Sequence, residues 1–144
     1  MPASVSFFSN VPDRIEHACR WVRRALQEGA SVQVVAEPAA LHELDQRLWT
    51  FDPQAFVPHV RARAMAAVPS RLRDTPVALL ESLGAEPPRP GAILLNLGAS
   101  VPAGFEPFER VVEIVSQDPQ DRAEARTRWR QYEAAGCTLT NQAL

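Results

Sequence analysis

The last third of the chain holds the residues whose types and spacing could most readily do chemistry. Arg122, Arg126 and Arg130 recur every four residues, and Trp129 directly precedes the last of them. On a helix, these spacings bring the four side chains onto one broad face. A guanidinium can hold a carboxylate through two parallel hydrogen bonds, and an aromatic ring can wall a pocket for an apolar side chain. Taken alone, the helix pattern favours a solvated arginine face with one half-buried tryptophan. The alternative, which the aromatic cluster described next favours, is a groove for an acidic peptide with an apolar end.

A second aromatic cluster lies earlier in the sequence. Trp49 closes a predicted helix, and the segment Phe56-Val57-Pro58-His59 follows after a short loop. Aromatic side chains near a helix end often form pocket walls, although packing in the core is the usual fate of a tryptophan. Trp49 and Phe56 are therefore further candidates for a binding pocket.

Several enzyme chemistries lack the residues that they need. All 15 basic residues are arginine, which excludes a P-loop and a Schiff base, since both require lysine. The first predicted strand is followed by Ser9-Asn10-Val11-Pro12, with no glycine that would let a pyrophosphate approach. His42 and Asp45 share a helix but lack a third metal ligand. We therefore expect no catalytic residue, no metal site and no cofactor.

The composition is that of an ordinary globular protein. The 144 residues are 46% hydrophobic and 22% charged, which suits one domain with a sizeable core. The net charge of −2 argues against wholesale binding to duplex DNA, because such binding needs a broad basic surface. We find neither a membrane span nor a signal peptide, so we expect a cytoplasmic protein. Cys19 falls on the apolar stripe of a predicted helix, and we expect it to be buried.

Hydrophobic periodicity predicts strands and helices in alternation. Strands are predicted at 5–9 and 31–36, and helices at about 12–28 and from Pro38 onward. This β-α-β-α order is typical of a parallel sheet with helices packed against it. Residues 51–76 contain four prolines and are predicted to be a loop with at most short turns.

The second half of the sequence predicts the remaining strands and helices. They are strands at 77–80, 92–97 and 111–115, a turn or short helix at 104–108, and a last helix at about 119–135. The connection 84–91 is too short for a crossover helix, which favours antiparallel pairing of the strands on either side of it. The final eight residues are expected to form a loosely held tail. The whole chain, residues 1–144, is predicted to be a single α/β domain with a central, mostly parallel sheet of about five strands and helices on both faces.

Two blocks of sequence resemble a known family. Leu44-Asp45-x-x-Leu48-Trp49 with Phe56-Val57-Pro58-His59 forms the first block. The second is Val111-Val112-Glu113-Ile114-Val115, followed by Arg126-x-x-Trp129-Arg130-x-Tyr132 and Gly136. Both blocks, in this order and at this separation, resemble the chi subunit of bacterial DNA polymerase III holoenzyme. The resemblance covers nearly the whole chain but not the stretch 61–75.

The resemblance implies a non-catalytic adaptor in DNA replication. Chi subunits bind the acidic C-terminal tail of single-stranded DNA-binding protein and also bind the psi subunit, so that they link the clamp-loader assembly to coated DNA and meet DNA only indirectly. Carried over to this sequence, the tail-binding residues are Trp49, Phe56, Val115, Arg122, Arg126, Trp129 and Arg130. Trp129 stands where tyrosine is common, and Arg122 and Arg130 stand where lysine occurs. Charge and aromatic character are therefore kept.

The resemblance also assigns a role to each of these residues. Arg126 would pair with the terminal carboxylate of the tail, and Arg122 and Arg130 would meet acidic residues upstream of it. The pocket for the last apolar side chain would be formed by Trp49, Phe56, Val115 and Trp129. The alternatives are a small nucleotide-binding α/β enzyme and an unrelated α/β subunit that assembles with some other partner.

Overall fold

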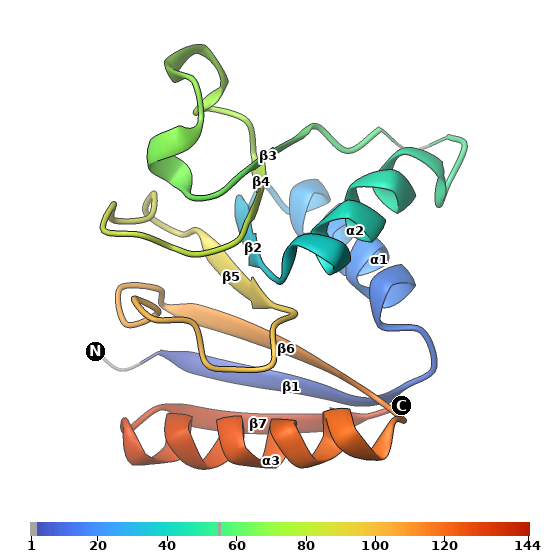
Figure 1. The fold of residues 1–144 in the computed structure, drawn as a ribbon, viewed down its shortest axis with the longest axis vertical. Helices are drawn as coiled ribbons and strands as arrows, with labels where there is room; N and C mark the ends of the chain where they lie inside the picture. The colour runs from blue at the N-terminus through green and yellow to red at the C-terminus, as the bar shows by residue number, and fades with distance from the viewer. Residues whose placement is uncertain (1–2, 55) are drawn as a thin grey trace.

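The computed structural model describes residues 3–54 and 56–144, and in this part of the chain seven strands form one open sheet with three α-helices (Figure 1). The helices are α1 (Arg14–Gln27), α2 (Pro38–Thr50) and α3 (Pro119–Ala134). The strands are β1 (Ser4–Val11), β2 (Val32–Val35), β3 (His59–Ala62), β4 (Val77–Leu80), β5 (Ile93–Asn96), β6 (Arg110–Ser116) and β7 (Thr138–Ala143). Two 3-10 turns, Met65–Ala67 and Ser70–Leu72, lie between β3 and β4.

The strand order is β3-β4-β2-β5-β6-β1-β7, and all neighbouring strands are parallel. The predicted antiparallel pairing around 84–91 is wrong. β4 and β5 flank β2 instead, with Val32 paired to Val77 on one side and to Ile93 on the other. Their connection, 81–92, is an irregular crossover in the position that a helix usually takes in a parallel sheet. Leu83 and Ala92 from its two ends are buried in the core.

Two strands were not predicted, and both are at the edges of the sheet. β3 replaces part of the predicted loop 51–76, and β7 replaces the predicted loose tail. β7 is polar and mostly exposed, so it gives no hydrophobic signal; it is held by its backbone pairing with β1, from Ser4↔Thr138 to Ser9↔Ala143. The prediction of about five strands therefore becomes seven.

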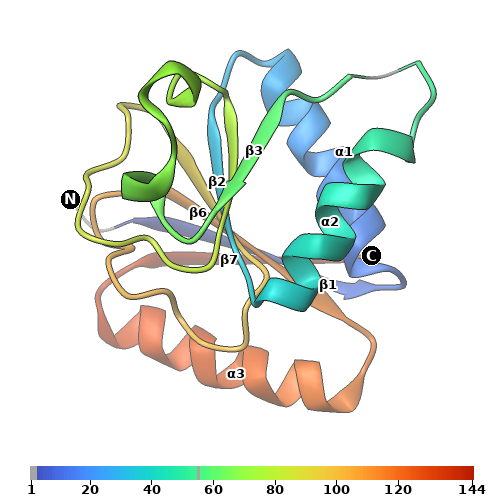
Figure 2. The ribbon, with the colours of Figure 1, turned by 45° about the horizontal axis from the view of Figure 1, so that its top comes forward.

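Helices cover both faces of the sheet, as predicted (Figure 2). α1 and α2 pack on one face against alternate strand residues such as Val34 and Ile114. α3 packs on the other face, where Val35 and Val115 lie in the core. The period-two alternation of strand side chains thus divides the interior into two layers. Cys19 is fully buried in the α1 layer, as predicted.

Local signals set the ends of α3. The Asp118 side chain accepts a hydrogen bond from the Gln120 backbone N–H at 3.1 Å, and Pro119 occupies the first turn. Both features are typical of a helix start. The chain leaves the helix through Gly136, whose φ of +83° is readily adopted only by glycine. β7 begins two residues later, so α3 runs back along the sheet and lies beside β7.

Candidate functional site

A pocket of about 410 Å³ lies between α3 and the ends of β1, β6 and β7. We call it the α3 pocket. It is lined by Phe7, Ser9, Val115, Arg122, Ala125, Arg126, Trp129, Arg130 and Asn141. Its volume lies in the range of about 300–1,000 Å³ that is usual for ligand sites. Five of the seven predicted tail-binding residues therefore meet in one cavity.

Three arginines of the α3 pocket point their charges at solvent rather than at a partner among the described residues. Arg122, Arg126 and Arg130 are exposed, and their side chains make no salt bridge or hydrogen bond within residues 3–54 and 56–144. Other arginines of this chain are engaged, for example Arg47, which pairs with Asp13 at 2.9 Å. An unpaired guanidinium keeps all its donors for a ligand. The α3 pocket is thus a place where carboxylates can bind.

The floor between these arginines is apolar and aromatic. Phe7 and Trp129 lie with their ring centroids 5.1 Å apart, and Val115 is almost fully buried beside them. The Trp129 side chain is only partly buried, so part of its surface faces the cavity. Burying apolar surface stabilises a complex by roughly 25 cal/mol per Å². The cavity therefore combines an apolar seat with cationic walls.

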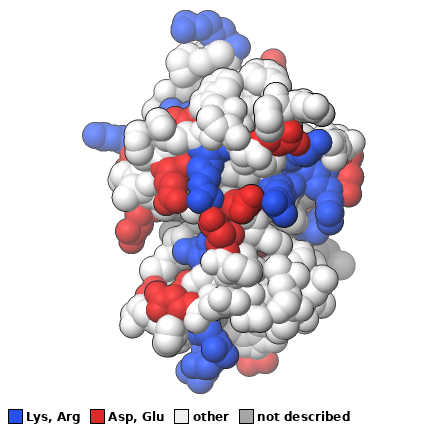
Figure 3. Space-filling model, turned by 90° about the vertical axis from the view of Figure 1, so that its right-hand side faces the viewer, with Lys and Arg blue, Asp and Glu red and all other residues white. Residues whose placement is uncertain are grey.

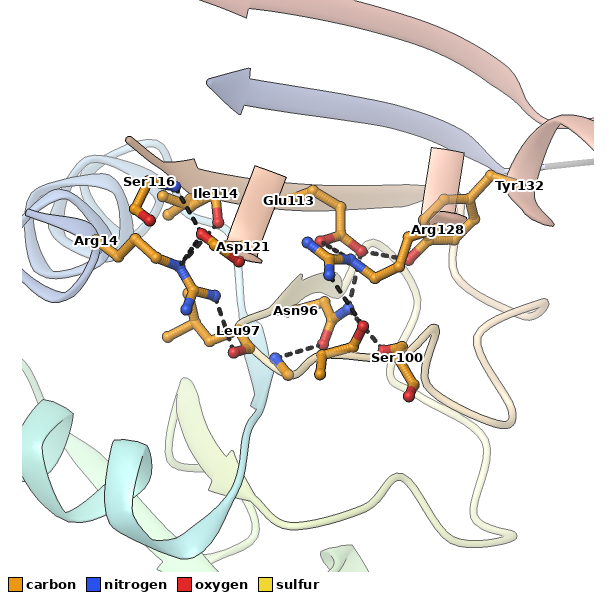
Figure 4. A network of polar contacts seen from close by, with 12 residues as sticks. Arg14, Asn96, Leu97, Ser100, Glu113, Ile114, Ser116, Asp121, Arg128 and Tyr132 are labelled. Atoms are coloured by element: carbon orange, nitrogen blue, oxygen red, sulfur yellow. Dashed lines mark hydrogen bonds and ion pairs between the residues drawn. The ribbon is translucent and has the colours of Figure 1, made fainter. Parts of the chain in front are cut away.

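A buried polar network holds α3 on the sheet (Figure 4). Arg128 Nε donates to Glu113 Oε1 at 3.0 Å, and its Nη1 donates to the Ala99 carbonyl at 3.0 Å. The Tyr132 hydroxyl and Asn96 Nδ2 both donate to Glu113 Oε2, at 2.7 and 2.8 Å. All three side-chain partners of the carboxylate are donors, which suits an ionised Glu113. The network fixes how far α3 is rotated, and so which side chains enter the α3 pocket.

Burial dominates the protonation behaviour of this network. Burial raises the pKa of the Glu113 carboxyl, and the Arg128 guanidinium together with the hydrogen bonds to the carboxylate acts in the opposite direction. Burial also raises the pKa of Tyr132, and the nearby negative charge of Glu113 raises it further. Tyr132 therefore stays a hydrogen-bond donor at any physiological pH.

A second set of contacts fixes the start of α3. Arg14 Nε donates to the Ile114 carbonyl at 3.0 Å, and its Nη2 donates to the Leu97 carbonyl at 2.9 Å. The same Nε lies 3.5 Å from Asp121 Oδ2, which also accepts the Ser116 backbone N–H at 2.7 Å. One arginine of α1 thereby joins the residue after β5, strand β6 and the first turn of α3 (Figure 4).

Trp49 and Phe56 do not reach the α3 pocket. Trp49 is near the end of α2, on the opposite face of the sheet, and its ring lies 5.8 Å from Phe56 and 4.9 Å from His59. The two side chains are 55% and 70% exposed and form a separate surface patch. The prediction that they wall one pocket with Val115 and Trp129 is therefore wrong, because neither is among the residues that line that pocket.

Four residues of the α3 pocket were not predicted: Phe7, Ser9, Ala125 and Asn141. Ala125 was within reach of sequence reasoning, since it precedes Arg126 on the sheet-facing side of the helix. The others come from β1 and β7, and Asn141 belongs to the stretch predicted as a loose tail. Only the strand order brings these residues to α3.

On the side shown in Figure 3, arginines and acidic side chains are interspersed, in keeping with the net charge of −2. Among the residues that the structure describes, no group of three or more His, Cys, Asp or Glu side chains could hold a metal ion. Over the same residues, no helix combines the length and apolarity needed to span a membrane.

The fold and the α3 pocket define a small parallel α/β protein with a cationic, aromatic-floored cavity beside an edge strand. Comparison with known proteins identifies the family to which it belongs. The family model described as "DNA polymerase III chi subunit, HolC" matches residues 1–140, and the chain belongs to this family.

Two curated relatives bear the name DNA polymerase III subunit chi. The protein of Pseudomonas aeruginosa is 38% identical over 133 residues, which are 91% of this chain and 87% of that protein. The protein of Haemophilus influenzae is 28% identical over 128 residues, 88% of this chain and 85% of that one. These matches support a part in DNA replication as an accessory subunit of polymerase III.

Proposed function

We propose that the α3 pocket binds the acidic C-terminal tail of single-stranded DNA-binding protein. The observation that supports this most strongly is the meeting of Arg122, Arg126 and Arg130 around the apolar floor of one cavity, none of them paired with another described residue. A chain terminus that ends in an apolar residue and follows acidic ones has the complementary chemistry: a carboxylate, a side chain to bury and further negative charge. The chain would then act as an adaptor that links coated single-stranded DNA to the clamp-loader assembly through psi.

The three arginines take different roles in this proposal. Arg126 lies between the other two and one helical turn from Trp129, so it receives the terminal carboxylate. The last side chain of the tail lies between Trp129 and Val115. Arg122 and Arg130, on either side, meet acidic side chains at the rim, where exposed ion pairs contribute about 1 kcal/mol or less each.

The patch of Trp49 and Phe56 stays outside the tail site. Its exposed aromatic surface suits contact with a second protein, since large exposed aromatic side chains often mark interaction sites. We propose psi as a partner on the strength of the family and assign it no surface.

We also propose that the chain catalyses no reaction itself. The family assignment to an accessory subunit supports this, as does a sequence without lysine, which can form neither a P-loop nor a Schiff base. No feature of the described residues favours the alternative of a nucleotide-binding enzyme.

Calorimetric titration with two forms of one peptide tests the tail proposal. The peptide is acidic and ends in phenylalanine; one form has a free terminal carboxylate and the other a terminal amide. We expect the amide to bind at least tenfold more weakly, because it removes the charge that Arg126 receives. Equal affinity of the two forms, or no binding of the free acid, would contradict the proposal.

A further inference from the structure

A second arginine-lined cavity lies on the other face of β1 and β7. It has a volume of about 500 Å³, and Arg20, Arg24 and Arg110 line it together with Phe8, Trp21 and Gln142. We call it the α1 pocket. α1 supplies one wall, and the face of β1 and β7 that α3 does not cover supplies the floor.

Arginines outnumber acidic side chains in the lining of the α1 pocket. Within the described residues, Arg24 and Arg110 have no carboxylate partner, and Arg110 lies over the Trp21 ring, 5.7 Å from its centroid. Arg20 pairs with Glu16 at 3.1 Å, but its side chain is 72% exposed, so solvent weakens that contact. Glu28 is the acidic side chain that lines the cavity, and the last residue, Leu144, lines it as well.

His17 also lines the α1 pocket, and the arginines of the cavity act on its pKa. Burial lowers its pKa, and the positive charges of Arg20 and Arg24 lower it further. His17 is therefore mainly neutral near pH 7, and the positive charge of the cavity comes from the arginines.

The two arginine-lined cavities lie back to back across one edge strand. Asn141 and Gln142 are neighbours on β7 and point to opposite faces; Asn141 lines the α3 pocket and Gln142 lines the α1 pocket. Their partners on β1 divide in the same way, with Phe7 opposite Asn141 and Phe8 opposite Gln142. In the part of the chain that the structure describes, no strand pairs with the outer side of β7. A bound chain can thus pass from one cavity to the other around β7.

The length of chain needed for this passage is short. An extended chain advances about 3.3 Å per residue, so about eight residues reach roughly 26 Å, several times the spacing of about 4.8 Å between neighbouring strands. An acidic tail anchored by its terminus in the α3 pocket would bring its upstream carboxylates to the α1 pocket.

We propose that the α1 pocket is a second contact for the same acidic tail: its upstream carboxylates bind Arg20, Arg24 and Arg110 after the tail has passed around β7. This proposal rests on the proposed function of the α3 pocket. Phosphates of single-stranded DNA would also suit these arginines. We favour the peptide because the cavity adjoins the α3 pocket and because three arginines around one cavity are a small basic surface for a nucleic acid.

Peptides of two lengths test the proposal. The short peptide has only the last four residues of an acidic, phenylalanine-ended tail, and the long one adds about eight upstream residues rich in aspartate. For the wild-type chain we expect the long peptide to bind about tenfold more tightly at low salt, and the advantage to shrink as salt rises. The double variant Arg24→Gln/Arg110→Gln should lose most of this advantage and keep its affinity for the short peptide.

The matched control is Arg63→Gln/Arg71→Gln, which removes two exposed arginines near the opposite edge of the sheet. It should keep the length advantage. The inference is overturned if wild type shows no length advantage, if the Arg24/Arg110 variant keeps it, or if the control variant loses it equally. It is also overturned if a bare oligonucleotide binds in an Arg24- and Arg110-dependent way and its presence removes the difference in affinity between the long and the short peptide. Failure of the short peptide to bind wild type would instead overturn the proposed function.

Discussion

Removing the charge of Glu113 should destabilise the protein strongly. Glu113 is 0% and Arg128 1% exposed, and Arg128 Nη2 already lacks a partner within the described residues. The change Glu113→Gln keeps the shape and one acceptor oxygen but leaves the guanidinium buried without a counter-charge. Breaking a buried pair in this way costs about 3–5 kcal/mol, against a total stability of about 5–15 kcal/mol for a typical domain.

Urea unfolding followed by circular dichroism measures this loss. Arg20→Gln is the matched control, since it breaks an exposed pair with Glu16 and should cost about 0.5 kcal/mol or less. The double variant Glu113→Gln/Arg128→Met removes the stranded charge, so it should recover at least about 1 kcal/mol of the loss. A loss below about 1 kcal/mol for Glu113→Gln would refute the view that this charge pair fixes α3 on the sheet.

Two further predictions concern reactivity and nucleic acid. Burial raises the pKa of the Cys19 thiol to about 12 and also raises the pKa of Cys137, but Cys19 is buried whereas Cys137 is partly exposed. At pH 8 a thiol reagent should therefore modify Cys137 well before Cys19 in the folded chain; equal labelling of both, read by mass spectrometry, would contradict this. A bare single-stranded oligonucleotide should bind negligibly at physiological salt, since the net charge is −2, and micromolar affinity in fluorescence anisotropy would be the opposite result.

The sequence predicts the interior of this fold better than its edges. β4, β5 and β6 are short apolar runs buried on both faces, and such runs are recognisable. β3 and β7 are edge strands with few buried side chains, so their pairing depends on neighbours rather than on their own pattern. The parallel arrangement of β4 and β5 depends on an irregular crossover, which leaves no periodic signal in the sequence.

The same division applies to the site. The spacing of Arg122, Arg126 and Arg130 correctly predicts residues that share one cavity, because helix geometry alone relates them. The contributions of Phe7 and Asn141 depend on which strands become neighbours of α3. Trp49 was joined to the site by family resemblance, and residues of one family signature need not share one face of the sheet.

The replacement Arg126→Ala tests the central claim most directly. Calorimetric titration with the acidic, phenylalanine-ended peptide should show affinity lower by about 2–5 kcal/mol, tens- to thousands-fold, if Arg126 receives a terminal carboxylate partly shielded from water beside Trp129. The control Arg71→Ala, an exposed arginine near the other edge of the sheet, should bind like wild type. Unchanged binding by a folded Arg126→Ala variant would contradict the assignment of the α3 pocket as the tail site.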